Sequence, residues 1–561
     1  MTIASRSFAA MLKIGPAITR NIAVERDVAI PAPDNARLLT DVYLAGPARP
    51  LPVILLRSPY GRGGVYGTMA RLFAERGYHA VVQSTRGTFG SEGRIDFDRE
   101  AADGRSAADW IVDQPWSNGV LGTFGGSYLG FTQLALASTR PPQLKAMALA
   151  VWAAERRAYA YPGGAFSLDR LGWALVIANQ ERRFSFVRAA LGARSRRGRP
   201  EFDHLPLISA DTAAVGHPIA FYRDWVTHDQ PGDPYWTPTD FRPILPDLGV
   251  PVTMLAGWYD MFLPSMLKDY QALRDGGQTV RLRVGAWHHT SQDLFRHEFA
   301  DALDWFATHL RGQQPPRQDQ EPPATAPPIR AEIMGGAGWR ELPTWPPRAD
   351  VQRWHLHPDG ALSTAEPGES DPDRYTYDPA DPTPAVGGTS TISSGPQDNR
   401  ALERRPDVLT YTTKPLTEEL EIIGPVAAEL FVGSSRPHTD FFVRLCDVDE
   451  KAASVNITDG ILRLTDAAEV PRRITVELWP TAHRFGAGHR IRLQVSSGSH
   501  PRYARNLGSP EPLATATTLN PARQSVHHDP ARPSAILLPV SDRKSKASNS
   551  NPLFRTDPGS A

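Results

Sequence analysis

Residues 122–131 read GTFGGSYLGF, in which a single serine, Ser127, is set among glycines. An apolar run from Val120 to Phe124 leads into this stretch, and a helix-like segment from Leu129 to Ala137 follows it. A serine hydroxyl is a useful nucleophile only when a base can reach it, and a sharp strand-to-helix turn exposes it in that way. The stretch therefore predicts a nucleophile turn, in which the Tyr128 N–H at the helix start can donate to a developing oxyanion.

The glycine spacing differs from the usual pattern of such turns, which is G-x-S-x-G. Leu129 stands where the last glycine is expected, and the next glycine is Gly130. On this stretch alone, a glycine-rich strand-to-helix turn with an incidental serine therefore remains open.

Two later strands supply partners for Ser127. The apolar run 252–256 leads to Asp260, and the run 280–284 leads to His289. In α/β-hydrolases the chain order is nucleophile, acid, histidine, and the carboxyl ends of parallel strands face the crevice that holds the site. We therefore predict a catalytic triad in which Asp260 orients His289 and His289 takes the proton of Ser127.

The periodicity of the chain changes along its length and predicts its domains. Short continuous apolar runs alternate with helix-length segments in the first part, which is typical of a mostly parallel sheet with helices on both faces. After the proline-rich stretch the period becomes two, as in Ile474, Val476 and Leu478, which favours an antiparallel sandwich or jelly roll. The expected units are an α/β-hydrolase catalytic domain (1–151 and 246–311), an inserted helical cap (152–245), a proline-rich linker (312–328), a jelly-roll β-sandwich (329–540) and a disordered tail (541–561).

Composition excludes several classes of partner. The chain has 61 Lys+Arg and 61 Asp+Glu, so no overall field attracts nucleic acid or an anionic membrane. Cys446 is the single cysteine, so no intramolecular disulfide can form, which favours a reducing, cytoplasmic location. No metal-binding or nucleotide-binding motif is present, so we expect no metal and no cofactor. The edges of the sandwich would also allow a homodimer.

Further motifs match one family of serine hydrolases. They are Arg57-Ser58-Pro59-Tyr60, Thr85-Arg86-Gly87, Gly90-Ser91-Glu92-Gly93, Gln114-Pro115-Trp116, Gly257-Trp258-Tyr259-Asp260, Gly285-Ala286-Trp287-His288-His289, Tyr375-Thr376-Tyr377-Asp378-Pro379 and Gly395-Pro396-Gln397-Asp398. On these residues the chain resembles the cocaine esterase / NonD group, which is related to the X-Pro dipeptidyl peptidases. The resemblance covers nearly the whole chain, and the family's own nucleophile motif is G-x-S-Y-x-G.

The resemblance implies two further assignments. The family uses a tyrosine hydroxyl after an early strand as an oxyanion donor, and Tyr60 stands at that position. The family pattern ends in one histidine, which matches His289, so His288 is expected to be a neighbour that tunes polarity.

The substrate is harder to derive from the sequence. We expect a small-molecule ester or amide, with ester hydrolysis as the first interpretation and a dipeptidyl peptidase or acylase as the second. Related peptidases hold a free amine with acidic groups, for which Glu155 and Asp169 are candidates, although both could be solvated helix residues. A catalytically inactive binding module is the alternative of another class. The aromatic residues expected to line the pocket are Trp152, Phe166, Trp173, Trp258, Phe262 and Trp287.

Overall fold

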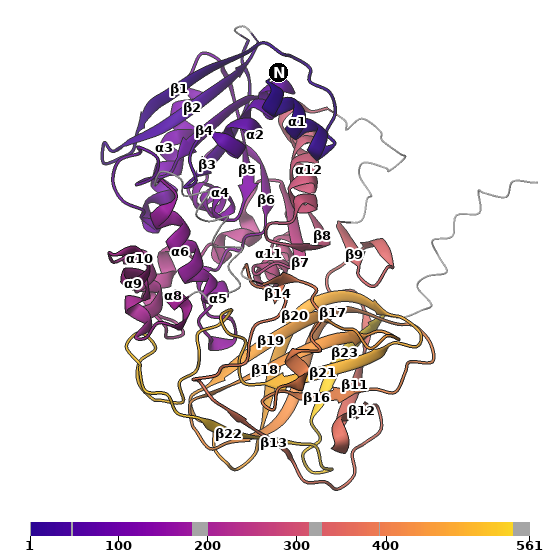
Figure 1. Cartoon of the computed structure of the whole chain (residues 1–561). Helices are drawn as coiled ribbons and strands as arrows, with labels where there is room; N and C mark the ends of the chain where they lie inside the picture. The colour runs from indigo at the N-terminus through magenta and orange to yellow at the C-terminus, as the bar shows by residue number, and fades with distance from the viewer. Residues whose placement is uncertain (1, 47–48, 182–199, 314–327, 392, 542–561) are drawn as a thin grey trace, which may run out of the picture.

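The computed structural model describes residues 2–46, 49–181, 200–313, 328–391 and 393–541. Figure 1 shows an α/β part above a separate β part, with a group of short helices beside them. This arrangement confirms the predicted fold class of an α/β core, a helical cap and a C-terminal antiparallel β domain. Apart from their end residues, the expected linker (312–328) and tail (541–561) lie outside the described residues.

The α/β core is built on one sheet with the strand order β1-β2-β4-β3-β5-β6-β7-β8-β9-β10. The strands from β4 to β9 are parallel, whereas β1, β2 and β10 add antiparallel edges. The bounds are β1 Ile22–Pro31, β2 Arg37–Ala45, β3 Leu51–Ser58, β4 His79–Ser84, β5 Ser117–Gly126, β6 Leu144–Ala150, β7 Val252–Tyr259, β8 Val280–His288, β9 Ile329–Ile333 and β10 Gly338–Leu342.

Helices cover both faces of this sheet. Ile54 and Leu56 of β3 pack in a cluster with α1, α2 and α12, whereas the alternate residues Val53 and Leu55 pack against α3 and α4. Side chains alternate between the faces of a strand, so a strand covered on both sides must be apolar throughout. The core helices are α1 Ile3–Leu12, α2 Gly64–Glu75, α3 Glu100–Val112, α4 Tyr128–Ser138, α11 Leu263–Asp275 and α12 Gln292–Arg311.

The insertion between β6 and β7 is helical, as expected. Its aromatic side chains pack on the same cluster as the core helices α4 and α11, so the cap and the core share one apolar interior. Its described α-helices are α5 Arg156–Ala160, α6 Asp169–Asn179, α8 Pro200–Asp203, α9 Ala210–Val215 and α10 Ala220–Thr227.

The C-terminal domain is an antiparallel β-sandwich. Its strand order is β13-β22-β17-β23-β11-β12-β16-β21-β18-β19, and β20 pairs with β17. The short β14 and β15 form a separate pair. The bounds are β11 Ala349–His357, β12 Ala361–Ser363, β13 Asp373–Tyr377, β14 Gly388–Thr389, β15 Ser394–Gly395, β16 Leu409–Thr412, β17 Leu420–Ser434, β18 Thr439–Val448, β19 Ser454–Leu464, β20 Arg472–Phe485, β21 Arg490–Ser496, β22 Ala522–His527 and β23 Ala535–Ser541.

The start of the β-sandwich differs from the prediction. The sequence predicts residues 329–342 as part of the sandwich, but β9 pairs in parallel with β8 and β10 pairs with β9, so both strands extend the core sheet. Ile329, Ala331 and Ile333 alternate as buried residues on β9. Period-two alternation identifies a strand, but it does not say which sheet the strand joins. Here β9 covers the edge of β8 that would otherwise be unpaired.

The three parts meet next to the ends of β7 and β8. The Tyr259 hydroxyl at the end of β7 donates to the Asn456 carbonyl of the sandwich at 3.2 Å. In the cap, Asp169 accepts hydrogen bonds from Ser390 and from the Thr391 N–H of the sandwich. The site predicted at the carboxyl ends of the strands therefore lies where core, cap and sandwich pack together.

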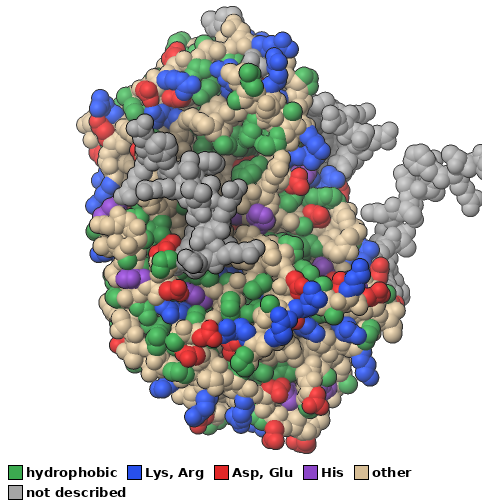
Figure 2. All heavy atoms as spheres, in the orientation of Figure 1, with side chains coloured by type: hydrophobic (Ala, Val, Ile, Leu, Met, Phe, Trp, Pro, Cys, Tyr) green, Lys and Arg blue, Asp and Glu red, His purple; other side chains and the backbone are tan. Residues whose placement is uncertain are grey.

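The surface shows no single dominant charge on the face in view. In Figure 2, basic and acidic side chains are interspersed over both the upper and the lower parts of the molecule. This agrees with the equal numbers of basic and acidic residues, 61 of each. Among the described residues, no helix combines the length and apolarity needed to cross a membrane.

Candidate active site

Ser127 occupies a sharp turn between β5 and α4. Its backbone has φ 57° and ψ −126°, a region that costs a non-glycine residue on the order of 1–3 kcal/mol. Neighbouring glycines make this turn possible. A Cβ at Gly125 would lie 2.6 Å from Leu129, and a Cβ at Gly130 would lie 2.6 Å from the Trp152 Cβ. Close packing therefore requires glycine at position 130, not at position 129, where the usual pattern has it.

The three predicted triad residues are hydrogen-bonded to one another. The His289 Nε2 lies 3.1 Å from the Ser127 Oγ, and the His289 Nδ1 lies 2.6 Å from the Asp260 Oδ2. Asp260 is fully buried, and its other oxygen accepts the Phe262 N–H at 2.9 Å. A carboxylate accepts only, so the Nδ1 carries the proton of a neutral imidazole and the Nε2 is left to accept from the serine hydroxyl.

The position of these residues follows from the sheet. Asp260 comes directly after β7 and His289 directly after β8, while Ser127 follows β5. The three strands run parallel with only β6 between β5 and β7, so their carboxyl ends open onto the same edge.

Tyr60 lies beside the nucleophile. Its hydroxyl accepts the Trp173 indole N–H at 2.9 Å and forms a hydrogen bond with Ser127. Burial raises the pKa of the Tyr60 phenol, which keeps it neutral and protonated near pH 7. Because the hydroxyl accepts from Trp173, its own proton can be donated toward Ser127 or toward an oxyanion formed there.

The Tyr128 side chain points away from this site. Its hydroxyl donates to the buried Glu100 carboxylate at 2.7 Å, and Glu100 also pairs with Arg57 at 2.7 Å. The indole of Trp173 stacks on the Tyr128 ring, with centroids 5.8 Å apart. The anchored side chain fixes the first residue of α4, whose N–H is one of the donors that a helix start leaves without an intrahelical acceptor.

His288 stands apart from the triad. Its Nδ1 lies 3.3 Å from the Thr290 Oγ1, and its ring faces Gly395 of β15. The pKa of His288 is lowered, mainly because the ring is buried. The charge of Asp260 acts in the opposite direction and His289 lowers the pKa further, but both effects are smaller. His288 therefore lies at the boundary with the sandwich, and the imidazole that is hydrogen-bonded to Ser127 is that of His289.

A cavity of about 310 Å³ opens beside the triad. It lies between the nucleophile turn, α2 and the start of α12. Its lining residues are Tyr60, Val65, Tyr66, Met69, Phe124, Gly125, Gly126, Ser127, Val151, His289, Thr290, Leu294, Phe295 and Glu298.

None of the six aromatic residues predicted for the pocket lines this cavity. Two of them support residues that do, because Trp173 donates to Tyr60 and the Phe262 ring lies 5.6 Å from the His289 ring. Trp152 packs against Gly130 and Phe262.

The other three pack against aromatic residues outside this cavity. Phe166 packs against Tyr161, Trp258 against Trp345, and Trp287 against His297 and Trp339. The ends of β7 and β8, which carry Trp258 and Trp287, are covered by β9, β10 and the loop after β10. The sequence alone predicts β9 and β10 as part of the β-sandwich.

The cap acids considered as amine ligands are both engaged. Asp169 accepts from Ser390 and Thr391, and Glu155 pairs with Arg242 at 2.8 Å. Glu298 also lines the cavity, but in the sequence it resembles an ordinary glutamate of a helix, and the buried side of α12 also carries Asp301.

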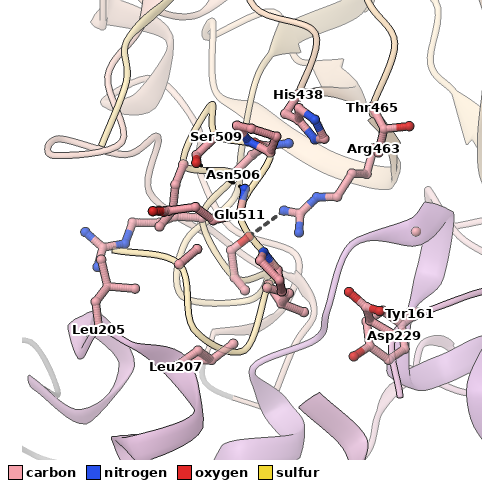
Figure 3. A pocket seen from close by; sticks show the side chains of 18 of the residues that line it. Tyr161, Leu205, Leu207, Asp229, His438, Arg463, Thr465, Asn506, Ser509 and Glu511 are labelled. Carbon is pink, nitrogen blue, oxygen red and sulfur yellow. Dashed lines mark hydrogen bonds between the residues drawn. The ribbon is translucent and has the colours of Figure 1, made fainter. Parts of the chain in front are cut away.

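A larger cavity, of about 520 Å³, lies between the cap and the sandwich and does not reach the triad. Figure 3 shows Leu205 and Leu207 on one side of it and Arg463 and Asn506 on the other. Both polar groups bind Asp440 at 2.8 Å, so they are satisfied within the fold. Within the described ranges, no cluster of His, Cys, Asp and Glu is arranged to hold a metal ion.

Comparison with known proteins gives the family. Residues 34–291 match the X-Pro dipeptidyl-peptidase (S15 family) model, and residues 324–537 match the X-Pro dipeptidyl-peptidase C-terminal non-catalytic domain. The cocaine esterase of Rhodococcus sp. (strain MB1 Bresler) is 32% identical, over 93% of this chain and 99% of its own. The chain belongs to the cocaine esterase family of serine hydrolases.

Solved structures share the whole fold of this cocaine esterase family member. An α-amino acid ester hydrolase has a TM-score of 0.76 and 24% identity, and covers 94% of this chain and 98% of its own. An aminopeptidase from the marine sediment archaeon Thaumarchaeota archaeon has a TM-score of 0.77 and 21% identity with the same coverage. The family and these neighbours agree with the predicted α/β-hydrolase core and jelly-roll domain.

Proposed function

We propose that this serine hydrolase is a carboxylesterase that cleaves small-molecule esters through an acyl-enzyme on Ser127. The observation that carries the proposal is the continuous hydrogen-bond chain from Asp260 through His289 to Ser127, with the Tyr60 hydroxyl beside the nucleophile. The family's serine esterases make an ester the first choice of substrate.

The chemistry follows from these contacts. The His289 Nε2 takes the proton of Ser127 as the Oγ attacks the ester carbonyl, and Asp260 stabilises the imidazolium that forms. The Tyr60 hydroxyl and the Tyr128 N–H donate to the oxyanion of the tetrahedral intermediate. His289 then protonates the leaving alkoxide, and a water molecule, activated by the same imidazole, hydrolyses the acyl-enzyme.

A dipeptidyl peptidase or acylase acting through the same triad is the second candidate, and the family model that matches residues 34–291 favours it. Peptidases of this kind must hold a free substrate amine. Both cap acids expected to do so, Glu155 and Asp169, are bound within the fold, which favours the esterase.

The test is a pair of measurements on the whole chain. Burst kinetics with p-nitrophenyl acetate should show acyl-enzyme formation in the wild type and none in a Ser127→Ala variant. A Ser127→Ala variant that keeps wild-type activity would reject the nucleophile. Faster hydrolysis of Ala-Pro-p-nitroanilide than of short acyl and benzoyl esters would replace the esterase by the peptidase. Failure of a fluorophosphonate to label Ser127 would instead indicate an inactive binding module.

A further inference from the structure

The cap helix α6 carries a buried arginine that the proposed mechanism does not use. Arg170 is 7% exposed, and no ion pair with an acid engages it within the part of the chain that the structure describes. Arg57, which is also buried, shows the usual arrangement, because it pairs with Glu100 at 2.7 Å. A buried charge without a counter-ion is costly to the fold, so the retention of Arg170 points to an anion that the chain itself does not supply.

The contacts of the Arg170 guanidinium leave some of its donors unused. Its Nη2 donates to the Met261 Sδ at 2.8 Å, and a thioether sulfur is a weak acceptor. Its Nε is buried with no acceptor among the described residues. The guanidinium carbon lies 4.8 Å from the centroid of the Tyr159 ring and 6.0 Å from that of Phe262, so two aromatic rings flank the charge. Ring faces stabilise a cation, but they leave it able to pair with a planar anion such as a carboxylate.

The guanidinium lies beside the acid and the base of the triad. Met261, which accepts from it, directly follows Asp260 in the chain. The ring of Phe262, which flanks it, lies 5.6 Å from the His289 ring, centroid to centroid. A single side chain therefore separates Arg170 from the catalytic imidazole.

The same helix also carries the support of the oxyanion donor. Trp173, three residues after Arg170, donates to the Tyr60 hydroxyl at 2.9 Å, and side chains three apart in a helix lie on one face. Burial raises the pKa of the Tyr60 phenol, and the charge of Arg170 is one of the smaller effects that oppose this rise. The guanidinium is therefore within electrostatic reach of Tyr60. Tyr60 and Trp173 are both partly exposed, so a substrate can approach this face.

A second cap arginine adds to the positive charge. Arg156 of α5 is 3% exposed, and within the described ranges no ion pair with an acid engages it either. Burial raises the pKa of the Tyr159 phenol, and the charges of Arg156 and Arg170 both oppose that rise, so Tyr159 lies within electrostatic reach of both cations. Two buried cations that no ion pair neutralises favour an anionic over a cationic substrate group in this part of the cap.

We propose that Arg170 is a specificity residue that binds a carboxylate of the substrate, so that the preferred esters carry an anionic arm extending from Ser127 past Tyr60 toward the cap. This inference rests on the proposed esterase function and names its substrate class. The guanidinium donates to the carboxylate, and the Tyr159 and Phe262 rings limit the access of competing water to the ion pair.

The experiment compares esters that differ only by a carboxylate in place of a carboxamide. Monoethyl glutarate against the ethyl ester of glutaric acid monoamide places the anion on the acyl side, and γ-benzoyloxybutanoate against γ-benzoyloxybutanamide places it on the alcohol side. Each kcat/KM is divided by the rate constant for alkaline hydrolysis of the same ester, which corrects for the reactivity of the carbonyl. In at least one pair we expect the wild type to prefer the anionic ester about tenfold or more.

Substitutions at Arg170 should remove this preference in a graded way. Arg170→Met replaces the cation by an apolar side chain and should reduce the preference about tenfold, with little effect on the neutral ester. Arg170→Lys keeps the charge without the planar fork and should retain part of the preference. The matched control is Arg242→Met in the cap, because the Arg242 side chain is 52% exposed and pairs with Asp240 and Glu155. The preference should survive in this control.

Three results overturn the inference. The first is a wild-type ratio near one in both pairs. The second is a preference that Arg170→Met leaves unchanged. The third is an equal loss of the anionic and the neutral ester in Arg170→Met, which would make Arg170 a support of catalysis or of the fold instead of a binding residue.

A binding measurement separates this inference from the proposed function. Sodium pentanoate should raise the Tm of the wild type above the value in sodium chloride of equal concentration, and the rise should be smaller in Arg170→Lys and absent in Arg170→Met. Equal shifts in the wild type and Arg170→Lys overturn the subsite even if Arg170→Met does not fold, and so does the absence of a shift in the wild type. If the shift depends on Arg170 but Ser127 neither hydrolyses esters nor reacts with a fluorophosphonate, the esterase fails while the carboxylate site stands.

Discussion

The contribution of Glu298 to the free energy of unfolding should fall as pH rises, and Glu298→Gln should remove that contribution. The Glu298 carboxyl titrates near 4.5 in an unfolded chain, and because burial raises its pKa it titrates at about 8 when folded. The folded pKa is the higher one, so between these values the native state holds a proton that the unfolded chain has released. Stability is therefore lost as pH rises through this window.

The size of the loss follows from the two pKa values. Each pKa unit corresponds to about 1.4 kcal/mol. Integrating both titrations, the Glu298 contribution falls by about 2.5 kcal/mol between pH 5 and pH 7, and by about 1 kcal/mol more up to pH 8. It changes little above pH 8 because the carboxyl is then ionised in both states.

The assay is denaturant unfolding of the wild type and Glu298→Gln at a series of pH values from 5 to 9, followed by tryptophan fluorescence. The difference between the two proteins cancels the other titrating groups, including Tyr60, Tyr66 and His289, which line the same cavity. The free energy of unfolding of Glu298→Gln should increase steadily relative to that of the wild type as pH rises to 8. A difference that stays constant across the series would refute the reasoning, because Glu298 would then be solvated or paired.

Three further substitutions test the site itself. Tyr60→Phe should lower kcat by roughly 10²–10³ with the fold intact by circular dichroism, because it removes an oxyanion donor; an unchanged kcat would contradict that role. Trp173→Phe removes the donor that holds Tyr60 at 2.9 Å and should lower kcat about fivefold, less than Tyr60→Phe. Gly130→Ala places a Cβ 2.6 Å from Trp152 and should destabilise by about 1–3 kcal/mol, read as a lower Tm.

Much of the catalytic centre could be predicted because its signals are local. The apolar run before Ser127 and the helix-like segment after it predicted a strand-to-helix turn, and β5 and α4 form that turn at Ser127. Asp260 and His289 each follow a strand of a parallel sheet, whose carboxyl ends must share an edge. The role of Tyr60, by contrast, came from family resemblance, since no periodicity marks a hydroxyl in a Pro-Tyr-Gly turn.

The pocket could not be predicted in the same way. Trp258 and Trp287 are aromatic residues at the ends of catalytic strands, but β9 and β10 cover that region and turn it into packing. Glu298 resembled an ordinary helical glutamate in the sequence. Its environment depends on α2 and the nucleophile turn, which lie far away in the chain.

The sequence by itself determined the elements, their order and the positions of the nucleophile, acid and base, because turns, apolar periodicity and strand ends are properties of neighbouring residues. Only the tertiary structure decided which sheet residues 329–342 join, which aromatic side chains reach the cavity, and that Glu298 is buried there with no partner among the described residues. Burial and desolvation depend on contacts between distant segments, so no local pattern encodes them.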